Sequence, residues 1–241
     1  MTVFGITLRA LLSRGRTAAL ALVPLAVAIV AVVVGTTERE DTDALIDAWG
    51  GLTGRLLVPL VVAFTTLVLA VSAIADDRDD GTLLLLTATC TPRWSIITQK
   101  GLAAWVGTVV LTAPATAACA LLGAWTGLGG EAVAATVIAA VLTALAYVGP
   151  FLLLSLLTHR AVLVGAVYIV LWEGSVANFA KSADSLSVAA YGRVLIADVL
   201  AGRTELTAAD VGTGAAAVVL VLIGVLGVAV ASWLLPRTEL R

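Results

Sequence analysis

Residues 76–100 read DDRDDGTLLLLTATCTPRWSIITQK and separate two long apolar segments of the chain. Four aspartates precede four consecutive leucines at 83–86. Carboxylates favour the N-terminus of a helix, and Asp80 or Thr82 can act as its N-cap. Pro92 disfavours helical geometry at the residue before it, so this helix should end within about ten residues. That length is too short to span a bilayer, so the stretch predicts a short surface helix between two membrane spans.

The composition of the whole chain is typical of an integral membrane protein. Of its 241 residues, 61% are hydrophobic and only 12% are charged, and the mean hydropathy is +1.09. Soluble domains are usually about 45 to 50% apolar and about 25% charged. A chain of this length holds about six helical spans of roughly 20 residues and no separate soluble domain of ordinary size. We therefore expect residues 1–241 to form a single all-α transmembrane domain.

The hydrophobic segments place the expected helices. Six spans are predicted, at residues 17–36, 57–75, 101–124, 132–157, 161–179 and 212–235. Before them, residues 1–16 carry apolar side chains at helical spacing close to three arginines, which predicts an amphipathic helix along the inner membrane surface. A signal peptide is the alternative for this segment. Between the fifth and sixth spans, residues 186–200 predict a short external helix with Arg193 and Asp198 on its polar side.

Lysine and arginine are unevenly divided between the two sides of the membrane, and cytoplasmic loops carry the excess of both. One side carries nine: Arg9, Arg14, Arg16, Arg78, Arg93, Lys100, Arg160, Arg237 and Arg241. The other carries five: Arg39, Arg55, Lys181, Arg193 and Arg203. Five acidic residues also crowd the first outer loop: Glu38, Glu40, Asp41, Asp43 and Asp47. We therefore predict a multi-pass plasma-membrane protein with both termini, and loop 76–100, on the cytoplasmic side.

Glu173 is the one acidic residue inside a predicted span, in the run YIVLWEGSVANF. A carboxylate in the middle of a bilayer costs about 2.5 to 3.5 kcal/mol on insertion scales, so such residues usually face a cavity or a partner. This favours a role for Glu173 in a pathway or an outer gate. The alternative is that the span ends at Gly174 and Ser175, which would leave the carboxylate near the outer headgroups.

Residues 76–100 also resemble the first cytoplasmic loop of type-2 ABC exporter permeases. In that family an acidic residue, a Gly-Thr-Leu sequence, a leucine-rich turn, an arginine and a lysine lead into the third membrane helix. The matching residues are Asp77, Gly81, Thr82, Leu83, Leu85, Leu86, Arg93 and Lys100. Family members often carry an acidic residue where this chain has Leu84. The resemblance implies that the loop is a coupling helix, which seats in a groove of the ATP-hydrolysing subunit.

The same resemblance implies a fold and a set of partners. The fold is six transmembrane helices with an N-terminal amphipathic elbow helix, a cytoplasmic coupling helix and a short external helical segment between spans 5 and 6. The partners are a second permease subunit, in a homodimer or a heterodimer, and two ATP-binding cassette subunits that hold ATP and magnesium. Short re-entrant helices after the fifth span close the outer side of the pathway in this family, which favours a gate at Glu173.

The sequence lacks the motifs of several enzyme classes. It contains no GxxxxGK[ST] phosphate loop and no HExxH zinc motif, so we expect no ATPase site, no cofactor and no metal on this chain. Cys90 and Cys119 indicate neither a disulfide framework nor a metal site. There is no basic stripe of the kind that nucleic-acid binding needs, so the expected partners are membrane lipid and other subunits.

Three alternatives to an exporter subunit are open. An ion-driven secondary transporter would need more intramembrane ionisable groups or an inverted repeat. An intramembrane serine protease would use Ser155 and His159, which a continuous helix would place one turn apart, but no oxyanion hole is evident beside them. A structural membrane scaffold would explain the hydrophobicity but not loop 76–100.

Overall fold

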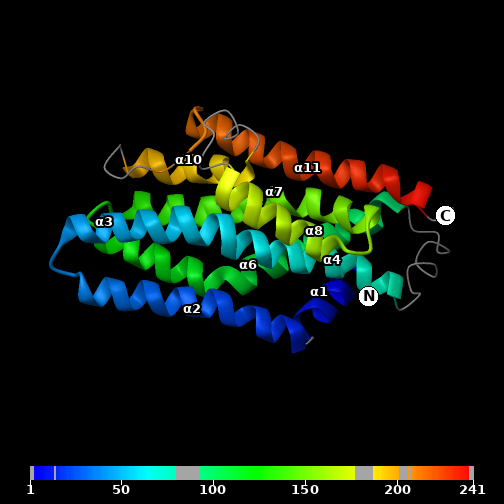
Figure 1. Ribbon diagram of the computed structural model, residues 1–241, viewed down its shortest axis with the longest axis horizontal. Helices are drawn as coiled ribbons and strands as arrows, with labels where there is room; N and C mark the ends of the chain where they lie inside the picture. The colour runs from blue at the N-terminus through cyan, green and yellow to red at the C-terminus, as the bar shows by residue number, and fades with distance from the viewer. Residues whose placement is uncertain are drawn as a thin grey trace.

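Helices make up almost all of the chain that the computed structural model describes. The described residues are 3–13, 15–79, 93–176, 187–200, 206 and 208–238, and no strand occurs among them. The helices are α1 (Val3–Ser13), α2 (Gly15–Thr37), α3 (Thr42–Gly51), η1 (Leu52–Val62), α4 (Ala63–Asp79), α6 (Arg93–Trp125), α7 (Gly130–Leu157), α8 (Ala161–Val167), η2 (Tyr168–Val176), α10 (Val188–Leu200) and α11 (Thr213–Thr238). The segments η1 and η2 are π-helices. Figure 1 shows an elongated bundle whose long helices follow its longest axis.

Among the described residues, five helical segments are long and apolar enough to cross a membrane. They are Ala19–Thr37, Thr42–Arg78, Trp94–Trp125, Gly130–Leu157 and Thr213–Leu234. The predicted all-α fold is confirmed, and these segments agree with a multi-pass membrane protein. The predicted span at 161–179 corresponds to a shorter apolar helix, Ala161–Glu173. The last three residues of the predicted span, 177–179, lie outside the described part of the chain.

The second span begins earlier than the sequence predicts. After α2, only residues 38–41 form a connection, and α3, η1 and α4 then continue without a break. Asp41 caps α3, because its Oδ1 accepts hydrogen bonds from the backbone N–H groups of Asp43 and Ala44, each at 3.1 Å. The assignment of Asp43 and Asp47 to the first outer loop is therefore wrong. Both belong to the helix α3. Polar residues mark where a chain leaves the hydrocarbon core, but a helix can continue beyond that point.

The helix α6 also begins earlier than the predicted span at 101–124. It starts at Arg93, directly after Pro92, which disfavours helical geometry only at the residue before it. Residues 76–100 therefore divide into the end of α4, a segment outside the described residues, and the first two turns of α6.

Packing at the centre of the bundle is closest between α7 and α11. The helix α7 contacts α4, α6, α10 and α11. A methyl group added at Gly149 of α7 would lie 2.7 Å from the Gly224 carbonyl oxygen and 2.8 Å from the Gly227 Cα, both on α11. The two backbones are thus in direct contact, which is how membrane helices commonly gain van der Waals packing.

The first helix packs beside the beginning of α6. The backbone N–H of Phe4 donates a hydrogen bond to the Gln99 side-chain oxygen at 3.2 Å. On α1, Leu11 is buried and Arg9 is exposed, which agrees with the predicted amphipathic character.

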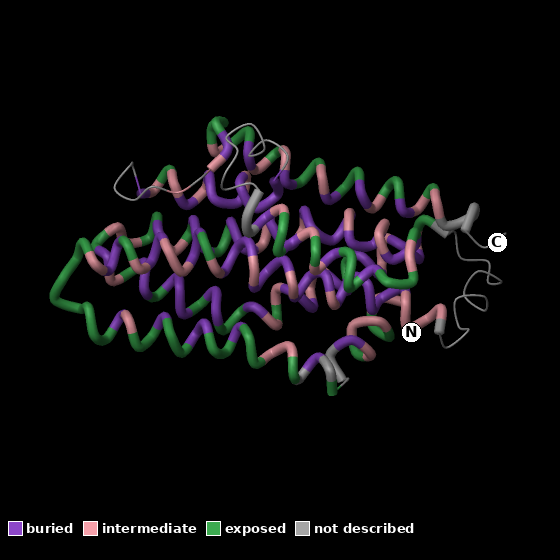
Figure 2. The backbone as a smooth tube through the Cα atoms, viewed as in Figure 1, coloured by how far each residue is buried: buried purple, intermediate pink, exposed green. Residues whose placement is uncertain are grey.

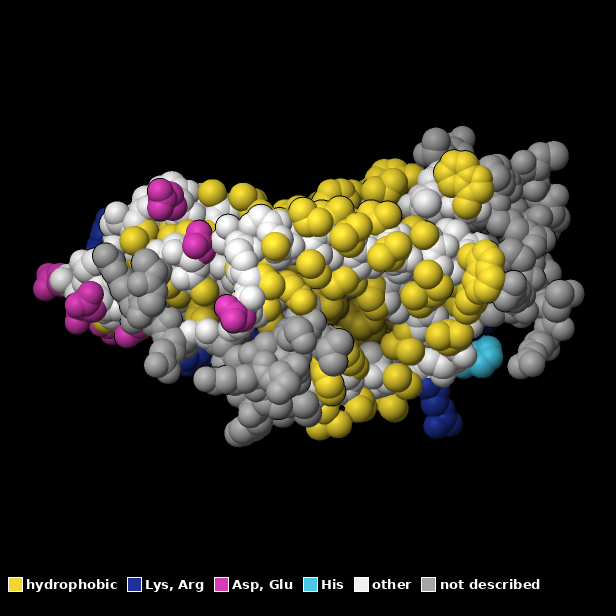
Figure 3. Space-filling model, turned by 90° about the horizontal axis from the view of Figure 1, so that it is seen from above, with side chains coloured by type: hydrophobic (Ala, Val, Ile, Leu, Met, Phe, Trp, Pro, Cys, Tyr) yellow, Lys and Arg dark blue, Asp and Glu magenta, His cyan; other side chains and the backbone are white. Residues whose placement is uncertain are grey.

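Exposed apolar side chains cover the outside of the bundle. Figure 2 shows exposed residues recurring along α2 and α11, with the buried residues gathered on the central helices. Leu22 and Ile29 of α2 and Leu222 and Leu226 of α11 are all about half exposed or more. In Figure 3, apolar side chains cover the middle of the molecule, acidic side chains gather at one end, and the histidine lies at the other. This distribution is typical of a protein whose middle faces hydrocarbon.

Candidate functional site

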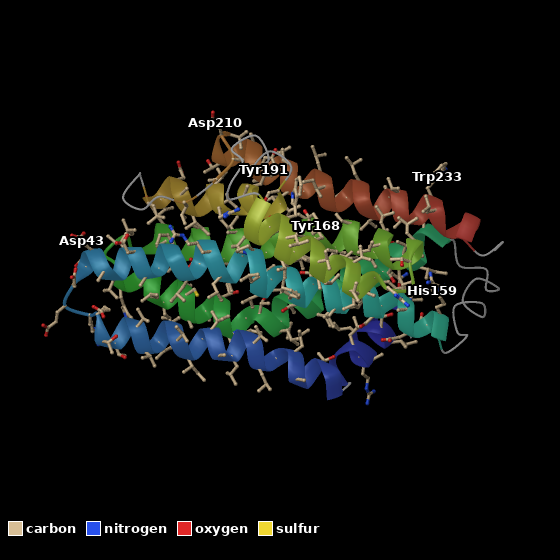
Figure 4. The ribbon with its side chains drawn as sticks, viewed as in Figure 1. Asp43, His159, Tyr168, Tyr191, Asp210 and Trp233 are labelled. Atoms are coloured by element: carbon tan, nitrogen blue, oxygen red, sulfur yellow. The ribbon has the colours of Figure 1, made fainter. Side chains whose placement is uncertain are left out.

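Two groups of polar side chains that include buried charged residues lie inside the bundle. One surrounds Glu173, where η2 meets the N-terminus of α10, and the other joins Lys100 of α6 to Asp77 of α4. In Figure 4, Tyr168 of η2 and Tyr191 of α10 mark the elements around the first group. His159 marks the end of the bundle at which α4 ends.

The Glu173 carboxylate is enclosed by protein. The residue is only 1% exposed, and four donors surround its two oxygens. Oε1 accepts from the Tyr168 hydroxyl at 3.0 Å and from the Val188 backbone N–H at 3.1 Å. Oε2 accepts from the Ala189 backbone N–H at 3.3 Å and from the Ser187 hydroxyl. The carboxylate is therefore buried inside the bundle.

These contacts make Glu173 and Ser187 a joint cap for α10. The Ser187 Oγ accepts a hydrogen bond from the backbone N–H of Ala190 at 3.1 Å, in the usual N-cap arrangement. The first three N–H groups of α10 thus all bond to one of these two side chains. A carboxylate at this position is also favoured by the positive end of the helix dipole. Glu173 therefore fixes η2 to α10, across residues that are remote in sequence.

The helix that this cap holds is packed into the bundle. A methyl group added at Gly192 of α10 would lie 2.4 Å from the Thr143 Oγ1 of α7 and 2.8 Å from the Val58 Cγ1 of η1. Arg193 is only 3% exposed, so its predicted place on the polar side of an amphipathic helix is wrong. The prediction failed because an amphipathic pattern assigns every charge to the solvent side, whereas here the arginine packs inside the protein.

Aromatic side chains complete the surroundings of Glu173. Tyr147 of α7 is 1% exposed, and its ring stacks on Phe151 with centroids 5.4 Å apart and an interplanar angle of 3°. Its hydroxyl lies within electrostatic reach of Glu173 and Arg193. A carboxylate, an arginine and two tyrosines therefore meet where three elements come together: η2, α7 and α10.

The second group joins the two helices that flank residues 80–92. Lys100 is 0% exposed, and its Nζ donates to the Asp77 Oδ2 and to the Ala73 carbonyl oxygen. Asp77 is 29% exposed. Lys100 therefore acts within this chain, where it fixes the beginning of α6 to the end of α4. The predicted contact of Lys100 with an ATPase subunit stays a prediction.

The other predicted coupling residues are mostly outside the described part of the chain. Gly81, Thr82, Leu83, Leu85 and Leu86 all lie there. Arg93 is the first residue of α6, so it follows directly on that segment.

The serine and histidine of the protease alternative are not on one continuous helix. The helix α7 ends at Leu157, and exposed His159 lies in the turn beyond it. Ser155 is buried, and its hydroxyl donates to the Val71 carbonyl oxygen at 3.2 Å. This arrangement gives the pair no support as a nucleophile and base. Within the described residues, no three His, Cys, Asp or Glu side chains are close enough to hold a metal ion.

Sequence reasoning singled out Glu173 but missed its partners. Ser187 stands directly before the apolar periodicity of 188–200, which is the usual sequence signal of an N-cap. Tyr168 carries no such signal, because its contact with Glu173 depends on the wide turn of η2.

Comparisons with known proteins assign this chain to no family. No family model matches it, and no curated protein matches it. The function must therefore be argued from the two polar groups and the sequence between them.

Proposed function

We propose that this chain is the membrane-spanning permease subunit of an ATP-driven type-2 ABC exporter, which forms the translocation pathway. In this proposal the chain lies in the plasma membrane and crosses it six times, with α8 and η2 as the fifth span. Both termini lie in the cytoplasm. The chain pairs with a second permease subunit, in a homodimer or a heterodimer. Two copies of a separate ATP-binding cassette subunit bind ATP and magnesium and carry out the hydrolysis.

The observation that carries the proposal is the ion pair between the buried Lys100 and the partly exposed Asp77. A loop that transmits movement from a partner must be anchored firmly to the spans that it moves. The pair supplies such an anchor, because it joins α4 to α6 at the two ends of the segment that resembles a coupling helix. Both residues also belong to the matched set of the resemblance.

The proposed cycle passes through this anchor. ATP binding closes the two ATPase subunits, and the leucine-rich segment at 83–86 moves together with the ATPase groove that holds it. Because Lys100 and Asp77 hold the ends of α4 and α6 together, both helices move as one body. The bundle interface then shifts between inward and outward access to the pathway.

Glu173 serves as the outer gate in this proposal. Its carboxylate holds the first turn of α10 against η2. The helix α10 packs on α7, and η2 packs on η1. A movement of α8 and η2 is therefore passed to α10 through one side chain. The π-helical geometry of η2 supports this role, because π-helical turns are frequent at functional sites.

A secondary transporter is the second candidate, and the same residue favours it. Buried intramembrane carboxylates are typical of proton relays in pumps and transporters. The two proposals differ in where the energy enters, since only the exporter needs the segment at 83–86 to bind an ATPase.

The variants Leu85→Asp and Leu84→Glu separate these proposals. If the leucines seat in a groove of the ATPase, Leu85→Asp places a charge in an apolar contact, and the loss of one buried leucine is worth about 1.5 to 3 kcal/mol. We expect retention of the co-expressed ATPase subunit on affinity-tagged permease to fall about tenfold or more. Leu84→Glu is the matched control and should be mild, because related permeases often carry an acidic residue there.

Neither residue lies in a span, so both variants should still insert and fold. Equal retention of the ATPase by the two variants would contradict a contact made through this segment. Substrate uptake driven by a proton gradient, without any ATPase, would favour the secondary transporter.

A further inference from the structure

An apolar groove runs between α6, α7 and α11 and opens to the side of the bundle. Its volume is about 520 Å³. Its walls are one face of each helix: Trp94, Gly101, Leu102 and Trp105 on α6, Leu145 and Val148 on α7, and Gly224, Val225, Val228 and Ala229 on α11. Thr98 and Ser232 complete the lining. Two of the lining residues, Gly101 and Gly224, carry no side chain.

The groove presents hydrocarbon alone to whatever fills it. The Thr98 hydroxyl donates to the Trp94 carbonyl oxygen at 3.0 Å, and the Ser232 hydroxyl donates to the Val228 carbonyl oxygen at 2.8 Å. The Trp105 indole N–H donates to the Val141 carbonyl oxygen at 3.1 Å. These three donors of the lining are therefore bonded within the protein. The occupant needs no hydrogen bonds along the length of the groove.

The length of the groove matches one leaflet of a bilayer. It extends along α6 from Trp94 to Trp105, which at a rise of about 1.5 Å per residue is about 16 Å. One leaflet contributes half of a hydrocarbon core that is about 30 Å thick. The exposed indoles of Trp94 and Trp233 lie toward the end of the bundle at which α6 begins and α11 ends, as aromatic residues do at a membrane surface.

Positive charge is present in the sequence at the same end. Arg93 is the first residue of α6, and Arg237 lies in the last turn of α11, so the two helices that border the groove each carry an arginine there. Basic sites between membrane helices on the cytoplasmic side are where anionic lipid headgroups bind. In the proposed orientation this end faces the cytoplasm, whose leaflet carries the anionic lipids.

We propose that this groove binds one anionic phospholipid of the inner leaflet. An acyl chain lies between α6 and α11 against α7, and the headgroup lies at the arginine-bearing ends of these helices. The lipid would pack beside the contact between α7 and α11, where Gly149 meets Gly224 and Gly227. The inference uses the proposed orientation of the chain but not the proposed ATPase partner.

Photolabelling of the full chain in phosphatidylcholine vesicles tests this proposal. The probe is a trace of phosphatidylglycerol with a diazirine on its acyl chain, and the labelled residues are located by mass spectrometry. We expect labels on the lining of α6 and α11, and competition by unlabelled phosphatidylglycerol but not by added phosphatidylcholine. Ala229→Phe should reduce the label about tenfold, because the ring fills the groove. Arg237→Gln should remove the preference for the anionic competitor.

Leu226→Phe is the matched control, since Leu226 is 59% exposed on α11 but does not line the groove. It should leave the labelling unchanged. Labels spread evenly over the exposed face of α2, or insensitive to Ala229→Phe, would overturn the site. Equal competition by phosphatidylcholine would overturn the anionic headgroup. Cross-links between two chains through Ala229→Cys, with both native cysteines replaced by serine, would show that a second copy covers the groove instead.

Discussion

Asp77→Ala is expected to destabilise the folded chain by about 3 to 5 kcal/mol, which is the usual cost of removing one partner of a buried ion pair. In this variant the buried Lys100 ammonium loses its carboxylate partner, and of the two acceptors described above only the Ala73 carbonyl oxygen remains. Lys100→Met should cost much less, because Asp77 is 29% exposed and its carboxylate can reach water. The decisive result is that Asp77→Ala lowers the stability more than Lys100→Met does.

Thermal unfolding of the purified chain in detergent measures this difference. The double variant Asp77→Asn with Lys100→Met should recover most of the stability lost in Asp77→Ala, because no buried charge is left unpaired. Asp210→Ala removes an exposed aspartate and should change the stability by no more than about 0.5 kcal/mol. If Lys100→Met is as damaging as Asp77→Ala, the burial of the lysine does not determine the cost.

Glu173→Ala is expected to cost about 2 to 4 kcal/mol, since it removes a helix cap and leaves buried donors without an acceptor. The donors affected are the hydroxyls of Tyr168 and Ser187 and the first two N–H groups of α10. Tyr168→Phe removes only one of these hydrogen bonds and should cost about 1 kcal/mol. With a known substrate, Glu173→Ala should abolish transport under conditions in which the variant is still folded.

Hydrogen exchange locates the effect within α10. In Glu173→Ala the amides of Val188 and Ala189 should lose protection, while those near Leu200 should keep it. The control is Glu131→Gln, because Glu131 places a carboxylate in the first turn of α7 but is exposed. It should leave the exchange of both helices unchanged. Protection that stays the same at Val188 and Ala189 in Glu173→Ala would mean that the carboxylate does not hold α10.

The contrast between apolar and polar sequence was enough to predict the simplest helices. The predicted spans at 132–157 and 212–235 lie within a few residues of α7 and α11, because glycine or polar residues bound both apolar runs. The same contrast failed at α3, since Asp43 and Asp47 signal the end of the membrane but not the end of the helix.

Pairing between distant residues could not be predicted from the chain alone. Asp77 and Lys100 were each singled out, but nothing in a single sequence indicates that residues 23 positions apart bond to each other. Glu173 was recognised from the cost of a charge in a bilayer, whereas two of its four donors are backbone N–H groups of a helix that starts 15 residues later. Arg193 was misplaced for the same reason, since its burial depends on neighbours from other elements.

The two buried groups suggest how the ends of the bundle are connected. Lys100 and Asp77 fix α4 to α6 at one end, and Glu173 fixes η2 to α10 farther along the bundle. The helix α7 packs against α4, α6 and α10, and α8 contacts both α7 and η2. In the proposed exporter, this helix would carry a movement from the coupling segment to the outer gate.

ATP hydrolysis by reconstituted protein tests the central claim most directly. The purified chain alone, in lipid vesicles, should hydrolyse no ATP, because its sequence contains no phosphate loop. The complex purified after co-expression with an ATP-binding cassette subunit should hydrolyse ATP, and Leu85→Asp in the permease should abolish the co-purified activity. Robust hydrolysis by the isolated chain, or no association with any ATP-binding subunit, would contradict the proposal that this chain is an exporter permease.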